Sequence, residues 1–593
     1  MTPVAHGQTS LESALLDEVA FDDGWALIER FSSLVRESGS ADEHAAAEHI
    51  ASELARLDVA HEVYEPELYL SLPRESWVDA DGERYRAKPP SFAVPTPAAG
   101  LEGALAYVPS KRVTGQRDLF AGGPAASLPD VSGKIVVTEG YAMPGTVARF
   151  EAAGAAGQIY VNPGRNIHWG ICTSIWGTPT TRDLERKPRT PVIAVSRPDG
   201  ERLIERAGAG GRARLHVALE EGWLACKVPV ARIPGERDEF LLVHGHYDSW
   251  DVGIGDNAVG DATLLELARI FARGPRARRS LWIAWWPGHS TGRYAGSTWF
   301  ADEFALELRK RCVGAVNVDS PGCWHATEYD DVMWMAEAGP LCEGAIADAA
   351  GKTAKRLRPL RAGDYSFNHI GLTSFYMLLS NIPEAEREAL GFYPTGGCGG
   401  NIAWHTEDDL MDVAERANLE RDLGVYVTTI ARVLEKPVLP YDFRLTVSEL
   451  AEQLAGYREA AAGRVDLVRA ETELTALREA LDGLYAGIDT DPPEGAKADA
   501  VSASFLELSR LLVPVGYAEG GPFEHDPALP RTPIPRLARI RDLDAVERSE
   551  PGALPFLVAE LRRAVNHVAN AFYEAARVVE RASRALRAPA DID

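Results

Sequence analysis

Residues 240–260 read FLLVHGHYDSWDVGIGDNAVG: an apolar run of strand length, a polar loop, and the start of a helical pattern. His246 and Asp248 lie just beyond the strand, and Asp256 opens the segment before the helix. Zinc prefers imidazole nitrogen and carboxylate oxygen at about 2 Å, and a histidine at a strand end with a carboxylate on the next loop supplies both. An aspartate two residues from a ligand histidine can orient that imidazole. An isolated HxD pattern is more often a hydrogen-bonded turn.

The same alternation of strand and helix patterns runs from residue 225 to residue 435. Strand patterns such as RRSLWIAWWPG (278–288) and CVGAVNVDS (312–320) are separated by helical patterns such as STWFADEFALELRKR (297–311). This rhythm predicts an α/β fold with a doubly wound, mostly parallel sheet. The functional groups of such a sheet gather at the carboxyl ends of its strands.

Further acidic and histidine side chains occupy equivalent positions in this region. Asp319 follows the apolar strand pattern in AVNVDS, and His405 lies in the polar loop NIAWHTEDD, shortly before a helical pattern. Buried carboxylates and imidazoles are costly unless they are paired or bind a metal. Together with His246 and Asp256, these side chains predict a divalent metal site at one edge of the sheet.

The composition limits the class of protein. A chain of 593 residues is too long for one hydrophobic core, so several domains are expected. The net charge of -25 argues against nucleic acid or an anionic membrane as partner, because both would repel the protein. The chain has no signal-peptide pattern and no membrane-spanning run, so we expect a soluble, cytoplasmic protein. The six cysteines are widely spaced without a CxxC pair, which favours reduced thiols.

Changes in sequence character divide the chain into three predicted domains. Residues 1–74 and 223–436 carry the strand and helix alternation and form a discontinuous catalytic domain. Residues 75–222, with short strands broken by Gly and Pro, form an inserted β-rich domain. Residues 437–593 form a helical C-terminal domain.

The helical C-terminal domain contains two long amphipathic patterns. Residues 446–486 predict a helix that begins with a capping box of Thr446 and Glu449, and residues 552–587 predict another helix. Helices of this length need a partner surface, which is either the catalytic domain or a second subunit.

An ordered set of motifs resembles a known family. GHYDSW, DNAVG, GSTWFADE, NVDS and WHTEDD are similar in order and spacing to the zinc-dependent exopeptidases that include bacterial aminopeptidases, glutamate carboxypeptidase and the transferrin receptor. The resemblance covers most of the chain. Residues 131–164 resemble the protease-associated domain that larger members carry as an insertion, and the helical C-terminus occupies the place of their dimerisation domain. The resemblance therefore implies a homodimer formed through this helical domain.

The resemblance also implies one or two zinc ions and the residues that hold them. The implied ligands are His246, Asp256 (bridging two ions), Asp319 and His405, with Asp248 as the carboxylate behind the ligands. The family's remaining ligand and its general base are two adjacent glutamates after the strand that ends here in Trp286. This chain has no such pair.

His289 stands near the missing glutamates, and two registers are possible. In the first, His289 aligns with the base and Ser290 with the ligand, so one zinc is held and His289 accepts a proton from water. An imidazole pKa of about 6.5 suits that task. In the second, His289 is a metal ligand, Gly288 falls at the base, and Glu407 is the nearest substitute base. The alternative to both registers is a structural imidazole bonded to backbone.

These residues predict a zinc-dependent hydrolase of an amide or peptide bond, with Asp248 and His289 as catalytic residues. Because the glutamate pair is absent, a non-peptide amide such as an N-acyl compound is an alternative to a small peptide substrate. Arg293, Trp404 and Glu407 are candidate substrate-binding residues, and a guanidinium can hold a carboxylate in a bidentate pair.

Two further expectations concern a rival function and the role of Asp364. A receptor-like binding protein, which has kept the fold and lost catalysis, is the rival hypothesis. The retained metal-ligand set argues against it, because an abandoned site has no physical reason to keep those residues. Asp364, in the segment GDYSFNHIG, is expected only to cap or turn the chain.

Overall fold

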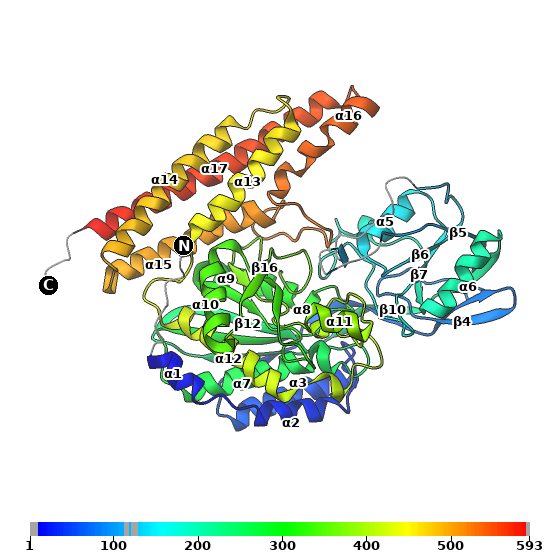
Figure 1. Cartoon of the computed structure of the whole chain (residues 1–593), viewed down its shortest axis with the longest axis horizontal. Helices are drawn as coiled ribbons and strands as arrows, with labels where there is room; N and C mark the ends of the chain where they lie inside the picture. Colours follow the sequence, from blue (N-terminus) through cyan, green and yellow to red (C-terminus); the bar gives the residue numbers. More distant parts are fainter. Residues whose placement is uncertain (1–9, 112–114, 116–117, 120–127, 589–593) are drawn as a thin grey trace.

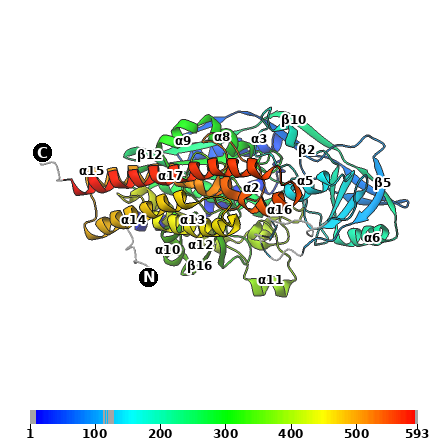
Figure 2. The ribbon, with the colours of Figure 1, turned by 90° about the horizontal axis from the view of Figure 1, so that it is seen from above.

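The computed structural model describes residues 10–111, 115, 118–119 and 128–588. Figure 1 shows three parts: a central layer of strands between helices, a β-rich part at one side, and a bundle of long helices above the centre. Seen from above in Figure 2, the long helices of the bundle run side by side across the central part.

The central sheet has, in the described part of the chain, six strands in the order β1-β11-β13-β12-β14-β17. Their bounds are β1 His61–Tyr64, β11 Val228–Ile233, β12 Arg237–His246, β13 Arg279–Trp286, β14 Cys312–Asn317 and β17 Ser374–Phe375. β12 is parallel to both β13 and β14, and β14 is parallel to β17. β1 and β11 form an antiparallel edge. The predicted α/β fold with a mostly parallel sheet is confirmed.

Helices cover both faces of this sheet and bury β12, the strand that ends at His246 of the GHYDSW motif. Leu241 of β12 packs with the residues of helix α7 (Val259–Arg273), whereas Leu242 packs on the opposite face with Phe300 of helix α8 (Ala295–Glu303). A strand buried on both faces is apolar throughout, which explains the continuous apolar run of the sequence. This packing on both faces fixes the position of His246, the last residue of β12.

The other helices of the central part complete its two layers. They are α1 Ser10–Leu16, α2 Asp22–Phe31, α3 Ala41–Arg56, α9 Ala305–Arg311, α10 Gly339–Ala350, α11 Glu384–Leu390 and α12 Arg416–Glu435. A small parallel pair is formed by β15 Tyr329–Met333 and β16 Ala354–Leu357. Among the described helices, none combines the length and the apolar composition needed to cross a bilayer.

The β-rich part has a sheet and a core of its own. Its strands, in the order β4-β3-β9-β5-β6-β7-β8, are β3 Ser76–Ala80, β4 Glu83–Ala87, β5 Leu101–Tyr107, β6 Ile135–Glu139, β7 Gly157–Val161, β8 Val192–Val195 and β9 Arg212–His216. Helices α5 (Pro144–Ala152) and α6 (Arg197–Gly208) belong to it. The chain enters and leaves along an antiparallel pair, β2 (Glu67–Pro73) and β10 (Leu219–Ala225). The boundaries at 75 and 222 stay a prediction.

The C-terminal helices differ in detail from the sequence prediction. They are α13 Phe443–Ala461, α14 Val468–Thr490, α15 Gly495–Tyr517, α16 Leu543–Ser549 and α17 Leu554–Arg587. The single helix over 446–486 is therefore wrong: the chain turns between α13 and α14, where Ala462 and Gly463 take positive φ angles of 47° and 80°.

The predicted capping box is also wrong. Helix α13 begins at Phe443, and its cap is Asp442, whose side chain accepts a hydrogen bond from the backbone N–H of Arg444 (3.0 Å). The Thr446 hydroxyl instead donates to a carboxylate oxygen of Glu337 in the central part (2.7 Å). A long-range partner has displaced the local cap, and Thr446 fastens the helical bundle to the centre.

This anchor can be tested by replacing Thr446 with valine. Thr446→Val leaves a buried carboxylate oxygen of Glu337 without its donor, which should lower the free energy of unfolding by about 1–3 kcal/mol. Thr472→Val, at an exposed hydroxyl that bonds only its own helix, is the matched control. Urea denaturation measures both variants, and equal stabilities would contradict the anchor.

Candidate metal centre and active site

The candidate site lies at the carboxyl ends of three neighbouring parallel strands. His246 is the last residue of β12, His289 follows β13, and Asp319 follows β14. Asp256 lies in the turn η2 (Ile254–Ala258) before α7, and His405 comes from the later loop. These five residues are at most 9% exposed, so each side chain needs a charge partner or a ligand.

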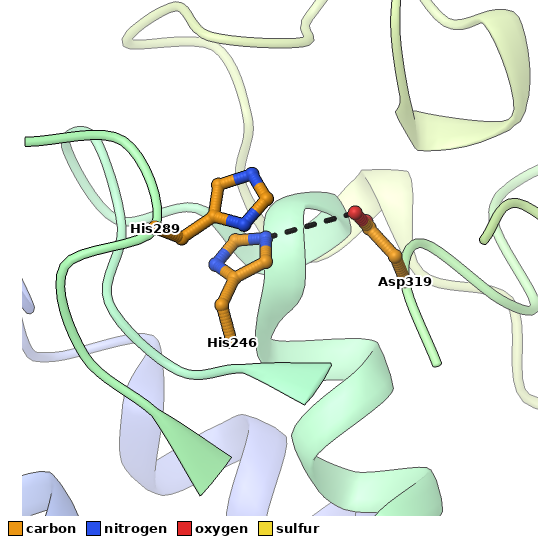
Figure 3. A group of neighbouring side chains, drawn as sticks. All are labelled: His246, His289 and Asp319. Atoms are coloured by element: carbon orange, nitrogen blue, oxygen red, sulfur yellow. Dashed lines mark ion pairs between the residues drawn. The ribbon is translucent and has the colours of Figure 1, made fainter. Parts of the chain in front are cut away.

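Asp256 stands between two imidazoles. Nε2 of His246 lies 2.9 Å from its Oδ1, and Nε2 of His405 lies 2.9 Å from its Oδ2. Oδ2 of Asp319 lies 3.8 Å from the same nitrogen of His246, and a dashed line joins these two residues in Figure 3. The structure thus brings together the four residues predicted from separate motifs.

The contacts of the other ring nitrogens show which tautomer each neutral imidazole would adopt. Nδ1 of His246 lies 3.0 Å from the backbone oxygen of Asp248, and Nδ1 of His405 lies 2.9 Å from the backbone oxygen of Trp169. A carbonyl oxygen only accepts, so both Nδ1 atoms donate. In the neutral imidazole, each Nε2 then presents a lone pair to a carboxylate oxygen of Asp256. Two acceptors facing each other repel unless a positive charge lies between them.

The buried carboxylates of the site favour a positive charge between the imidazoles and Asp256. Burial by itself lowers the pKa of His246, but the neighbouring carboxylates of Asp248, Asp256 and Asp319 raise it well above the usual value. Burial together with the charge on Asp256 raises the pKa of Asp319 to about 6. The buried carboxylates therefore attract either protons or a metal cation to this point.

A metal cation fits the observed geometry. The buried Nε2 of His246 makes no hydrogen bond although Oδ1 of Asp256 is close, as expected for two ligand atoms that face one ion. Tetrahedral zinc with bonds of about 2.0 Å separates its ligand atoms by roughly 3.3 Å. The distances from His246 to Asp256 (2.9 Å) and to Asp319 (3.8 Å) bracket this value.

Asp248 lies behind the cluster and fixes two of its members. Its Oδ2 accepts from the Ser38 hydroxyl (2.9 Å), and its Oδ1 accepts from the backbone N–H of His289 (3.2 Å). Its backbone oxygen receives Nδ1 of His246. Asp248 therefore orients one imidazole and holds the start of the loop that carries the other.

Two residues that the sequence reasoning did not select tie the loops together. The Asn257 amide donates to the backbone oxygens of His246 (3.1 Å) and Val318 (3.0 Å), so it joins the ends of β12 and β14. The carboxylate of Asp409 accepts from the backbone N–H groups of Gly255 (2.6 Å) and Asp256 (3.0 Å). Side-chain bonds to main-chain atoms of this kind carry no sequence pattern beyond the residue type.

His289 forms a dyad with Asp364. Its Nδ1 lies 2.8 Å from Oδ2 of Asp364, whose other oxygen accepts from the Ser297 hydroxyl (2.6 Å). Burial alone raises the pKa of Asp364, but the neighbouring His289 keeps it below the usual value, so the carboxylate is an acceptor. Nδ1 of His289 then donates, and in the neutral imidazole the lone pair is on Nε2. Besides any part in turning the chain, Asp364 orients the imidazole of His289.

The rings of His289 and His246 are stacked. Their centroids are 3.8 Å apart and their planes meet at 18°, and Figure 3 shows one ring lying over the other with Asp319 facing them. One ligand atom from each of His246, His289 and Asp319 falls within a common 4.8 Å. In two nearly parallel rings, the in-plane lone pairs run alongside each other and do not converge, which disfavours His289 as a second ligand of the same ion.

A cavity opens onto these residues. Asp256, His289, Asp319 and His405 lie in its wall, and the rest of its lining is largely aromatic or apolar: Tyr141, Met143, Ile171, Tyr294, Met377 and Trp404. Arg293 also lines the cavity. Two of the three candidate substrate-binding residues, Arg293 and Trp404, therefore reach it.

Glu407, the third candidate, is held elsewhere. Its carboxylate oxygens are paired with Lys88 (2.6 Å) and Arg86 (2.7 Å), and it is absent from the described lining of the cavity. Burial raises its pKa, but the hydrogen bond from Lys88 outweighs this and lowers the pKa to about 2. An acid this strong and already paired is a poor proton acceptor, which opposes Glu407 as a substitute base.

The β-rich part supplies the clamp on His405. The backbone of Trp169 donates to the His405 carbonyl (2.9 Å) and accepts from its Nδ1 (2.9 Å). The Trp169 indole donates to Asp251 (2.9 Å), and the ammonium of Lys88 lies 4.5 Å from its ring centroid. Residues 75–222 were predicted as a separate inserted domain, yet a residue within them positions a candidate metal ligand.

The cysteines do not offer a nucleophile. All six are unpaired and buried. Burial raises the pKa of the Cys398 thiol well above its usual value, so the reactive thiolate is disfavoured.

Comparison with known proteins agrees with the motifs. Residues 229–422 match the model of Peptidase family M28. Aminopeptidase NAALADL1 of Mus musculus is 33% identical over 293 residues, which cover 43% of this chain and 37% of that protein. The Inactive zinc metalloprotease C354.09c of Schizosaccharomyces pombe is 25% identical over 268 residues, covering 42% and 32%. The chain spans about a third of the length of these curated relatives. The resemblance to zinc exopeptidases is confirmed.

A solved structure has the same fold. BSAP, a zinc aminopeptidase from Bacillus subtilis, superposes with a TM-score of 0.53, covering 70% of this chain and 96% of its own. The sequence identity is 19%, so this likeness concerns the fold alone.

The clamp on His405 gives a testable prediction. Trp169→Leu removes the indole that Asp251 and Lys88 hold, so the backbone around His405 loosens. Because His405 faces Asp256, a proposed zinc ligand, this change should disturb Asp256 and lower zinc affinity about 10- to 100-fold. Trp223→Leu, at a tryptophan that is 57% exposed, is the control. Chelator competition measures both, and equal affinities would show that Trp169 does not position the ligand.

Proposed function

We propose that this protein is a zinc-dependent hydrolase of an amide or peptide bond, with His289 as the proton acceptor. The observation that carries the proposal is the placement of two imidazole nitrogens, each 2.9 Å from one oxygen of Asp256, beside Asp319. The similarity of residues 229–422 to Peptidase family M28 supports a hydrolytic reaction.

The proposed metal site has one position with three protein ligands. His246, Asp256 and Asp319 would hold one ion. His405 lies beside the other oxygen of Asp256, where a second ion would find only two protein ligands. Among the described residues, no third imidazole, thiol or carboxylate is grouped with that pair. A bound zinc ion supplies a Lewis acid that polarises a carbonyl and lowers the pKa of water toward about 7. One tightly held ion is the form that this donor set supports best.

The role of His289 follows from its partners. Asp364 accepts its Nδ1–H and so fixes the tautomer in which Nε2 is free. His289 lines the cavity, where Nε2 accepts the proton of the attacking water and later delivers it to the leaving nitrogen. The adjacent carboxylate stabilises the imidazolium that forms between these steps, as in other histidine–carboxylate pairs. This arrangement corresponds to the first register, with His289 in the place of the family's base.

The rival proposal is a receptor-like binding protein without catalysis. Similarity to a protein whose name describes it as an inactive zinc metalloprotease favours this reading. The retained set of buried ligands favours the hydrolase. Elemental analysis of the purified protein separates the two: about one zinc per chain is expected for the hydrolase, and a protein without zinc would favour the binding protein.

The wider assignment extends to substrate and assembly. The substrate is a small peptide or an N-acyl amide, and the site of action is the cytoplasm. Residues 75–222 act as a protease-associated domain, and residues 437–593 form a homodimer. Phe556 of α17 and Val468 of α14, which are 79% and 62% exposed, support an apolar contact on the helical bundle. Sedimentation of Phe556→Glu tests the dimer, which should dissociate; an unchanged wild-type dimer would exclude this surface.

The role of His289 can be separated from a ligand role by two measurements on one variant. His289→Ala should lower kcat by about 10²- to 10⁴-fold on an amide that the wild type hydrolyses, while its zinc content stays the same. Asp364→Asn should lower kcat in the same direction by removing the acceptor of the Nδ1 proton. His567→Ala, at an exposed histidine of α17, is the control.

The outcomes have distinct meanings. Loss of zinc together with loss of rate would make His289 a metal ligand. Wild-type rates in His289→Ala would make it structural.

A further inference from the structure

Arg293 is a buried arginine in the wall of the cavity. It follows His289 in the loop after β13, its residue surface is 5% exposed, and it lines the same cavity as His289, Asp256 and Asp319. The loop turns sharply here, since Arg293 has a φ angle of 48°. The backbone oxygen of Arg293 accepts from the N–H of Gly177, which holds the turn against the β-rich part.

Among the described residues, no carboxylate is paired with the Arg293 guanidinium. In the part of the chain that the structure describes, no carboxylate lies within 4.0 Å of its guanidinium, and its buried Nε has no hydrogen-bond partner. The Arg36 guanidinium, also buried, donates instead to three backbone oxygens, those of Tyr247, Val252 and Gly253. A buried cation without such partners is costly, and a ligand that supplies an anion would offset that cost.

A second guanidinium lies beside it. Arg293 and Arg361 line one adjoining pocket, together with Met143 of the β-rich part and Pro530 of the C-terminal part. Among described residues, Arg361 donates to the backbone oxygens of Tyr365, Asp526 and Pro527 and to no carboxylate within hydrogen-bonding distance.

The charge of this pocket is positive. Burial lowers the pKa of Arg361 to about 9, and the charge of Arg293 contributes to that lowering, whereas Asp526 opposes it. A pKa of about 9 keeps the Arg361 guanidinium charged at neutral pH. The pocket thus offers two cations next to a hydrolytic centre whose own carboxylates are already engaged.

We propose that Arg293 binds a carboxylate of the substrate, so the substrates are amides that carry an anionic group close to the bond that is cleaved. This inference rests on the proposed function. A guanidinium matches a carboxylate with two parallel N–H···O bonds, and Arg361 adds a second positive charge behind it. The aromatic wall, which includes the Tyr294 ring 4.9 Å from the Arg293 guanidinium carbon, accepts the apolar part of the ligand.

Arg293 is therefore a specificity-determining residue. A ligand with a carboxylate pairs with the buried cation, whereas the corresponding neutral amide leaves it unpaired. Hydrogen bonds to charged groups are strong enough that this difference should exceed about 10-fold in affinity.

A binding experiment tests the inference without turnover. The probes are phenylacetate and phenylacetamide, titrated calorimetrically into zinc-loaded and chelator-treated full-length protein. We expect wild type to bind phenylacetate at least about 10-fold more tightly than phenylacetamide in both metal states. Arg293→Met should lose this preference, Arg293→Lys should keep part of it, and Arg562→Met, at an exposed arginine of α17, should keep all of it.

Either of two results would overturn the inference. One is a preference that survives in Arg293→Met, or that is absent from the wild type. The other is a preference that disappears when the metal is removed, because the carboxylate would then be bound by the ion.

Hydrolysis measurements identify where the carboxylate comes from. Leucyl-glycine compared with leucyl-glycinamide tests a C-terminal carboxylate. Leucyl-glutamate compared with leucyl-glutamine, both amidated at the C-terminus, tests a side-chain carboxylate. The pair in which the acidic member has the higher kcat/KM, by at least about 10-fold in the wild type but not in Arg293→Met, names the source. Carboxylate binding without hydrolysis of any amide would refute the proposed function and leave the binding site standing.

Discussion

The structure depends on one buried carboxylate that has an imidazole nitrogen 2.9 Å from each of its oxygens. Because both imidazoles donate from Nδ1 to backbone oxygens, their Nε2 lone pairs face Asp256, and the arrangement repels itself without a positive charge. Several buried contacts hold Asp256 and the two imidazoles in this geometry. Asn257 joins the ends of two strands, Asp409 holds the turn that presents Asp256, and Trp169 of the β-rich part clamps His405.

The fold and the candidate ligands could be predicted from the sequence for a physical reason. Parallel strands covered on both faces are apolar runs that alternate with helices, and their carboxyl ends share one edge, so His246 and Asp319 had to come close. The partners across long separations could not be predicted. Asp364 reaches His289 over 75 residues from an irregular loop, and Lys88 holds Glu407 over 319 residues. Thr446 likewise matched a local capping pattern while a carboxylate 109 residues away took its hydroxyl.

The loop after β13 is where this chain departs from the family that it resembles, and the departures form a consistent set. In the proposed hydrolase, the imidazole of His289 replaces the expected carboxylate base, and the negative charge lies on Asp364, which is hydrogen-bonded to that imidazole. Four residues later, Arg293 brings an unpaired cation to the same cavity. A site with a neutral base and a buried cation is better suited to an anionic substrate than one with two extra carboxylates, because the attraction is not cancelled.

Anomalous diffraction at the zinc edge from crystals of the full-length protein tests the central claim most directly. The account predicts a peak at about 2 Å from Nε2 of His246 and from carboxylate oxygens of Asp256 and Asp319, with Nε2 of His289 outside bonding distance. Crystals soaked in zinc that show no peak there, with His246 donating a proton directly to Asp256, would contradict it.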